Sequence, residues 1–205
     1  MIYDSQVLKN KYFSYSNINQ KISLEVKKGN IVCIKKGLFS DNLYIDGPVI
    51  ANICCNPSYI SFEYALSYYG LIPEYVSLYT SACFSLKENK TYNTSNISFV
   101  YQYIPNNVFH YGITFIKNKD GINYKIATKE KAICDTLYSK YPVRSIKDLE
   151  ELLFENLRID EEDFLKLDLN FILEIAPLYR SNTLNTLIKY IERILKNENN
   201  DWRNN

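Results

Sequence analysis

The chain places its β-rich segments before residue 128 and helical patterns after it, and this division limits the folds it can adopt. A helix is expected over about 60–69, ended by Gly70, and several strand-like stretches rich in Tyr, Val, Ile, Thr and Phe follow it. These stretches are 75–81, 90–93, 97–104, 111–117 and 123–127. A run of strands followed by a run of helices is typical of α+β proteins. We therefore predict an α+β fold with a mostly antiparallel sheet.

Residues that cap helices mark the helical end of the chain. Thr128 begins a helix that extends to about residue 139, and Ser145 and Asp160 begin two more. Their side-chain oxygens accept hydrogen bonds from free N–H groups of the first turn. The last helix is expected over 182–196, where leucine and isoleucine form one apolar stripe, and the residues after it are expected to fray.

Two helices are also expected at the start of the chain, over 5–11 and over 16–28. The second begins with Ser16 as its cap and ends at Gly29, which tolerates the left-handed conformation that closes a helix. Its isoleucines and valine recur every four residues, so they share one face of the helix. The polar residues between them are therefore expected on the exposed side.

A lysine-rich hairpin is expected directly after the second helix. Two β-rich runs, 31–34 and 38–45, are joined by the turn Lys35-Lys36-Gly37. A helix followed by a basic hairpin is the arrangement of a winged helix.

Charge is distributed unevenly along the chain. The formal net charge is +1, which argues against a protein wholly devoted to wrapping nucleic acid. Residues 1–46, however, carry seven lysines and four carboxylates, whereas residues 145–205 carry eight basic and thirteen acidic groups. The pair Gly47-Pro48 marks a break after the basic part. We predict a winged-helix-like domain over 1–46 and a larger mixed domain with C-terminal helices over 47–205.

The exposed face of the second helix and the hairpin turn carry residue types suited to DNA. Asn and Gln pair with adenine through two hydrogen bonds, and Lys reaches guanine or a phosphate. The candidate DNA contacts are Asn17, Gln20, Lys21, Ser23, Lys27, Lys28, Lys35 and Lys36. A lysine-rich protein also places lysines on any solvated face, and charge and periodicity alone weigh these two interpretations evenly.

The sequence lacks the signatures of common enzymes. The glycine-rich phosphate loops and the HExxH, GxSxG and EF-hand patterns do not occur, and His110 is the only histidine. The five cysteines form no CxxC pair, so neither a zinc site nor a disulfide framework is predicted. We expect no enzymatic activity, no metal and no cofactor.

One enzymatic alternative is a metal-dependent nuclease. Glu63, Glu130 and Asp135 would bind a divalent cation if the fold brought them together, with Lys129 or Lys131 beside a phosphate. All three acids also lie on predicted helices, where a charge near the helix start or an ion pair explains them as well. The nuclease is the least favoured interpretation.

The chain begins without the basic flank and apolar segment of a signal peptide, and it contains no apolar run of the ~18 residues that a membrane helix needs. We expect a cytoplasmic protein with reduced thiols and no membrane partner.

Three segments resemble a known protein family. SYISFEYALSYYGLIPE (58–74) and IATKEKAICDTLY (126–138) are similar to the two signature segments of the AbiEi family, the antitoxins of abortive-infection, type IV toxin–antitoxin systems. Upstream, VKKGNIVCIKKGLF (26–39) is similar to the end of that family's winged helix. The matching positions of the two signature segments are Ser61, Glu63, Ala65, Leu66, Tyr69, Gly70, Leu71, Ile72, Ile126, Ala127, Thr128, Glu130, Lys131, Ala132, Asp135, Leu137 and Tyr138.

The resemblance covers about residues 16–141 and implies two activities. One is a winged-helix domain that binds double-stranded promoter DNA and represses its own operon. The other is a larger domain that counteracts a nucleotidyltransferase-like toxin. The resemblance gives no catalytic role to the motif acids, and it leaves the oligomeric state open.

The sequence departs from the family at the winged helix. Only about 15 residues precede the presumed recognition helix, which is short for two supporting helices. Cys33 and Phe39 stand where the family tends to have Arg and Tyr, and the lost arginine removes a phosphate-binding fork. A protein-interaction module that has lost DNA binding, and works through the larger domain or its acidic helices, is therefore the main alternative.

Overall fold

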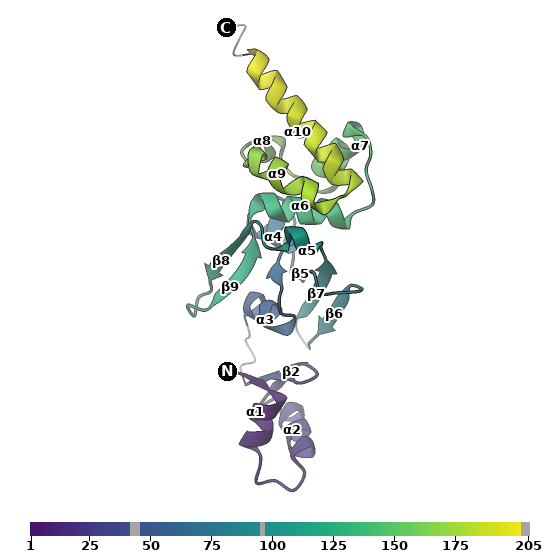
Figure 1. Cartoon of the computed structure of the whole chain (residues 1–205). Helices are drawn as coiled ribbons and strands as arrows, with labels where there is room; N and C mark the ends of the chain where they lie inside the picture. Colours follow the sequence, from purple (N-terminus) through teal and green to yellow (C-terminus); the bar gives the residue numbers. More distant parts are fainter. Residues whose placement is uncertain (42–45, 95–96, 202–205) are drawn as a thin grey trace.

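The computed structural model describes residues 1–41, 46–94 and 97–201. These residues form a small N-terminal unit with a three-stranded sheet, a larger unit with a mixed six-stranded sheet, and a set of C-terminal helices. Figure 1 shows the small unit at one end of an elongated molecule and the last helix, α10, at the other. The predicted α+β fold is confirmed.

The N-terminal unit combines two helices with three short strands. Strand β3 lies in the centre of its sheet and pairs antiparallel with both β1 and β2. The buried side chains of Tyr3, Leu8, Ile22 and Ile31 form its small core. Its elements are β1 (Ile2–Asp4), α1 (Ser5–Lys11), α2 (Ile18–Lys27), β2 (Val32–Lys35) and β3 (Leu38–Ser40). The predicted strand over 38–45 extends into residues 42–45, which lie outside the described residues.

Helix α2 begins slightly later than the sequence predicts. Its cap is Asn17 rather than Ser16, because the Asn17 side-chain oxygen accepts the backbone N–H of Gln20 at 3.0 Å. At the other end Gly29 has φ +73°, the left-handed conformation expected for a residue that ends a helix. The prediction of a helix ended by Gly29 is confirmed, and the choice of Ser16 as its cap is wrong.

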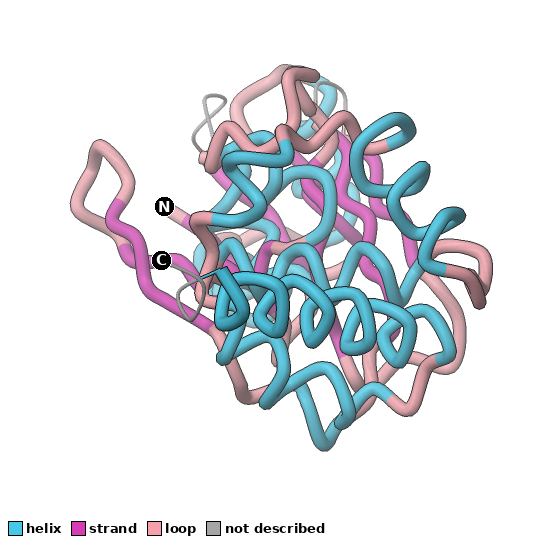
Figure 2. The backbone as a smooth tube through the Cα atoms, turned by 90° about the horizontal axis from the view of Figure 1, so that it is seen from above, coloured by secondary structure: helices cyan, strands magenta, loops and turns pink. Residues whose placement is uncertain are grey.

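The larger sheet has the strand order β6-β7-β5-β4-β9-β8. In this part of the chain three neighbouring pairs are antiparallel, whereas β4–β9 and β5–β7 are parallel. Figure 2 shows helices packed over these strands and the β8–β9 hairpin projecting to one side. The strands are β4 (Tyr59–Ile60), β5 (Tyr79–Cys83), β6 (Lys90–Asn93), β7 (Ser98–Tyr103), β8 (Ile113–Lys117) and β9 (Asn123–Ala127).

Helices pack around this sheet and form the C-terminal end. Thr128, Ser145 and Asp160 cap α6, α7 and α8 with their side-chain oxygens, as predicted. The helices are α3 (Gly47–Cys54), α4 (Phe62–Tyr68), α5 (Asn106–Phe109), α6 (Lys129–Ser139), α7 (Ile146–Glu150), α8 (Glu161–Leu165), α9 (Leu169–Ile175) and α10 (Asn182–Asp201), with a π-helical turn (Glu151–Asn156) and a 3-10 turn (Ala176–Tyr179) between them. Within the described ranges, none of the helices has both the length and the apolar character needed to cross a bilayer.

Several features of the larger unit differ from the prediction. The strand expected over 75–81 is β5, which begins only at Tyr79 and continues to Cys83. Gly47 and Pro48 begin helix α3, because proline fits the first turn of a helix, where its missing N–H costs no hydrogen bond. Gly47 is required there by packing, since a Cβ atom would lie 2.0 Å from Cζ of Tyr79. Ile60 belongs to the short strand β4 rather than to the helix that follows it, and α10 continues past residue 196 to Asp201.

We expect Asn17→Ala to destabilise the fold by about 1 kcal/mol, because it leaves an N–H group at the start of α2 without its side-chain partner. Ser16→Ala is the matched control and should leave the free energy of unfolding nearly unchanged. Urea unfolding of both variants, followed by circular dichroism, measures the difference. A larger loss in Ser16→Ala would contradict the observed cap.

Candidate nucleic-acid interface

The exposed face of α2 is the best candidate surface for DNA in the N-terminal unit. Gln20, Ser23, Leu24 and Lys27 recur at the three- and four-residue spacing that places side chains on one side of a helix, and all four are exposed. Ile22 is buried on the opposite side. This division is the one that the apolar periodicity predicts.

Two of the predicted DNA contacts have partners within the unit. The side-chain oxygen of Asn17 caps α2. The Lys21 ammonium group lies 2.8 Å from a carboxylate oxygen of Glu25 and 4.7 Å from the ring centre of Tyr15. The hydrogen bond with Glu25 raises the pKa of Lys21, and the hydrogen bond from Lys21 is the largest cause of the lowered pKa of Glu25. Lys21 therefore stays protonated, and its ammonium group is held by Glu25 of the same helix.

Lys35 lies at the junction between the two units of the chain. Its ammonium group donates a hydrogen bond to the backbone carbonyl of Cys54 at the end of α3 and lies 5.5 Å from the ring centre of Tyr92. Ile34, the residue before it, is buried in the core of the larger unit. The Lys35 side chain thus contacts the larger unit, whereas Lys36 in the same turn is exposed.

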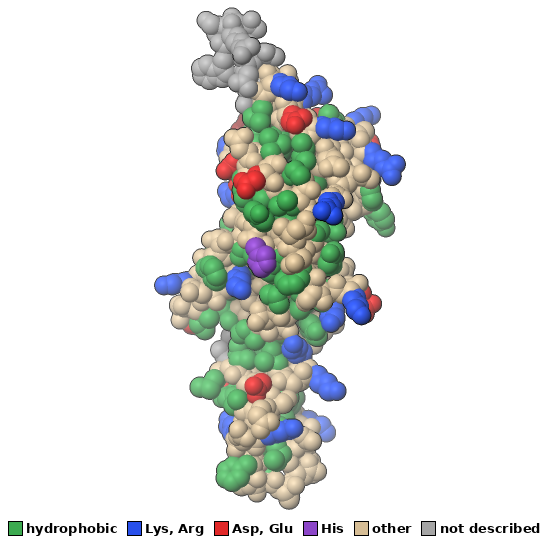
Figure 3. Space-filling view, in the orientation of Figure 1, with side chains coloured by type: hydrophobic (Ala, Val, Ile, Leu, Met, Phe, Trp, Pro, Cys, Tyr) green, Lys and Arg blue, Asp and Glu red, His purple; other side chains and the backbone are tan. Residues whose placement is uncertain are grey.

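Two exposed lysines line a hollow of about 470 Å³ between α1, α2 and the hairpin. Lys27 of α2 and Lys9 of α1 both line it, and Lys28 is exposed at the end of α2. Lys9 is not among the predicted DNA contacts, although it lies in α1, whose bounds match the predicted helix. The remaining lining residues are Ser5, Asn19, Ile22, Ser23, Val26, Cys33 and Phe39. Figure 3 shows blue side chains, which in this unit are lysines, next to hydrophobic ones on this end of the molecule.

The acids considered for a nuclease have separate partners. Glu63 forms an ion pair with Lys140 at 2.5 Å, and a carboxylate oxygen of Glu130 accepts the backbone N–H of Asp168 at 3.3 Å. Asp135 is fully buried. In the part of the chain that the structure describes, no group of three or more His, Cys, Asp or Glu side chains is placed to hold a metal ion.

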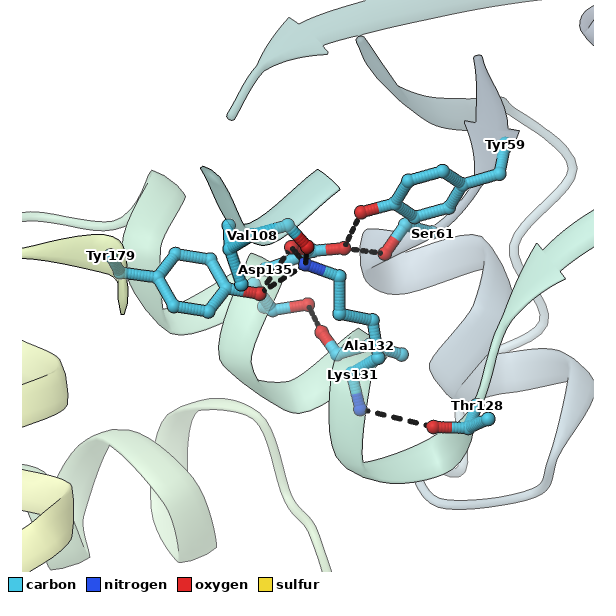
Figure 4. Close-up of polar contacts among 9 residues, drawn as sticks. Tyr59, Ser61, Val108, Thr128, Lys131, Ala132, Asp135 and Tyr179 are labelled. Atoms are coloured by element: carbon cyan, nitrogen blue, oxygen red, sulfur yellow. Dashed lines mark hydrogen bonds and ion pairs between the residues drawn. The ribbon is translucent and has the colours of Figure 1, made fainter. Parts of the chain in front are cut away.

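Asp135 instead forms a buried polar network with Lys131 (Figure 4). The Lys131 ammonium group lies 3.1 Å from one carboxylate oxygen of Asp135, and Tyr179 donates to the same oxygen at 2.6 Å. Tyr59 and Ser61 donate to the other oxygen at 2.9 and 2.7 Å. Lys131 also donates to the carbonyl of Val108 and to the Tyr179 hydroxyl oxygen, at 3.1 and 2.7 Å.

The two tyrosines of the network stay protonated. Burial, with the Asp135 carboxylate beside them, raises the pKa of Tyr59 and of Tyr179 well above the ordinary value. Both phenols are therefore hydrogen-bond donors at neutral pH. Lys131 and Asp135 are each completely buried, so neither reaches a substrate or a phosphate in solution.

A scan against protein-family models finds no matching family. A search of curated proteins finds no match either. The likeness to the AbiEi family therefore rests on the three sequence segments alone.

We expect Lys131→Met to destabilise the larger unit by about 3–5 kcal/mol, because it leaves the Asp135 carboxylate buried without its counter-charge. Lys140→Met is the matched control. It removes one partner of the part-exposed ion pair with Glu63 and should cost no more than about 1 kcal/mol. Chemical denaturation of the full chain measures both, and equal effects would contradict the structural role of the buried pair.

Proposed function

We propose that this protein is an AbiEi-like antitoxin and autorepressor that acts in the cytoplasm without being an enzyme. Its N-terminal unit binds promoter DNA, and its larger unit counteracts a nucleotidyltransferase-like toxin encoded beside it. The order and spacing of the three family-like segments support the proposal, together with the exposed polar face of α2. Within the described residues of α2 the one carboxylate, that of Glu25, is bound to Lys21 and does not repel a phosphate.

The outer face of α2 carries the case for DNA binding. This helix lies at the end of the molecule away from α10 (Figure 1). Its side chains Gln20, Leu24 and Lys27 are exposed. In the major groove, the Gln20 amide pairs with adenine and Leu24 contacts a thymine methyl group. Lys27, Lys28 and Lys36 neutralise backbone phosphates on either side.

The buried network supports a non-enzymatic role for the larger unit. Ser61, Lys131 and Asp135 belong to the family-like motifs and meet in that network, where packing and hydrogen bonding account for them. These polar positions therefore need no catalytic explanation.

A protein-interaction module without DNA binding is the second candidate function. The observation in its favour is that Asn17, Lys21 and Lys35 all have partners within the chain, which leaves fewer free groups for DNA than the sequence predicts.

The DNA-binding half is tested by titrating the full chain with a fluorescent duplex of its own promoter and with a scrambled duplex. We expect tighter binding to the promoter and a strong dependence on salt. Lys36→Ala should weaken binding to all sequences and lower the salt slope by about 1. Gln20→Ala should instead weaken promoter binding by about 1–3 kcal/mol and relax the sequence preference at the base pairs that Gln20 contacts.

Two control variants sharpen this comparison. Lys35→Met should keep the salt slope, because its ammonium group faces the larger unit, and Lys189→Ala on α10 should bind like the unchanged protein. Equal affinity for promoter and scrambled DNA at moderate salt would reject the repressor and favour the interaction module.

The antitoxin half is tested by co-expression with the product of the neighbouring toxin-like gene. We expect the full chain to restore growth, and a Gln20→Ala/Lys36→Glu variant to restore it equally while losing repression of a promoter reporter. Growth arrest that persists with a folded full chain would reject this half of the proposal.

A further inference from the structure

Two thiols of the larger unit lie in contact next to the junction. The sulfur of Cys55, the residue after α3, is 3.6 Å from the sulfur of Cys83, the last residue of β5. Cys55 is half-buried and Cys83 is completely buried. A small oxidant in solution therefore has access to Cys55, whereas Cys83 is placed to react only with its neighbour.

The same place holds a polar contact between the two units. Cys54, the residue before Cys55, accepts the hydrogen bond from Lys35 of β2 through its backbone carbonyl. Lys35 also lies over the ring of Tyr92 in β6, and β2 is in contact with β6. A displacement of Cys55 therefore moves the acceptor to which the hairpin is attached.

We propose that Cys55 and Cys83 form a reversible disulfide when the protein meets a hydroperoxide, and that this bond loosens the attachment of the N-terminal unit. The Cys55 sulfur attacks the peroxide, the O–O bond breaks, and a sulfenic acid and one water are formed. The Cys83 sulfur then attacks the Cys55 sulfur, and the oxygen leaves as a second water. In total two thiols are oxidised and one hydrogen peroxide is reduced to two waters.

Cys55, rather than Cys83, is the residue that has to move when the disulfide forms. A disulfide bond is about 2.05 Å long, so the sulfurs must approach by roughly 1.5 Å. Cys83 is paired with Tyr103 in the ladder of β5 and β7, inside the sheet. Cys55 has extended backbone just after the helix end. Cys55, at the helix end, is therefore less constrained than Cys83. The residue before it, Cys54, carries the carbonyl that accepts the hydrogen bond from Lys35.

The surroundings of Cys55 make the reaction slow at neutral pH. Burial, together with the Cys83 thiol, raises the pKa of Cys55 to about 11, while Lys35 of β2 and Lys90 of β6 act in the opposite direction. The Tyr101 hydroxyl of β7 is a further titratable group facing this place. Since the thiolate is the nucleophile, the oxidation rate should rise about tenfold per pH unit between about pH 7 and 9.

The modification is tested on the full chain with hydrogen peroxide, followed by thiol counting in denaturant and peptide mapping. We expect the free thiols to fall from five to three, a single Cys55–Cys83 peptide, and full recovery with dithiothreitol. Cys33→Ser, which removes an exposed thiol, is the matched control and should still lose two thiols. In Cys83→Ala, Cys55 should oxidise without any intrachain disulfide. Five thiols that persist, or links to other cysteines or between chains, would overturn the proposal.

The effect on the junction is tested by amide hydrogen exchange of the oxidised and reduced protein. We expect β2 and β6 to lose protection on oxidation and to regain it on reduction, with no change in peroxide-treated Cys55→Ser. Unchanged exchange in a protein shown to carry the Cys55–Cys83 disulfide would overturn the loosening. Neither measurement uses DNA or the toxin, so the inference stands or fails independently of the proposed function.

Discussion

The larger unit depends on one buried ion pair, that between Lys131 and Asp135. Two charges without solvent are stable only when their remaining hydrogen-bonding capacity is used. Here the side chains of Tyr59, Ser61 and Tyr179 supply that bonding, together with the carbonyl of Val108. The three side chains come from β4, the start of α4 and the turn before α10. The pair therefore fixes how α6 lies against the sheet and against the C-terminal helices, and it accounts for Ser61, Lys131 and Asp135 of the family-like motifs.

The N-terminal unit depends for its stability on its contact with the larger unit. Its own core is small, and units of about 40 residues usually need additional support. Ile34 and Lys35 supply that support from the hairpin, one by packing into the larger core and the other by the hydrogen bond to Cys54. The hairpin whose turn carries Lys36, a proposed phosphate contact, is thus also the segment that attaches the N-terminal unit to the larger unit.

Several local features of the fold were predictable from the sequence, whereas features that depend on distant segments were not. The caps Thr128, Ser145 and Asp160 act within their own turns, so sequence alone identified them. Strand β4 is defined by its neighbours β5 and β9, which are distant in sequence. The candidate site divides in the same way: periodicity identified the outer face of α2, whereas the partner of Lys35 lies nineteen residues further along the chain.

The proposed DNA binding requires the exposed face of α2, with Gln20 and Leu24, to lie against bases of the promoter. Photo-crosslinking from single positions of the full chain tests it most directly, with a photoreactive residue placed at 20, at 24 or, as a control, at the exposed position 189 of α10. The account predicts crosslinks to promoter bases from positions 20 and 24 and none from position 189. Crosslinks to DNA from position 189 alone, or from none of the three, would contradict it.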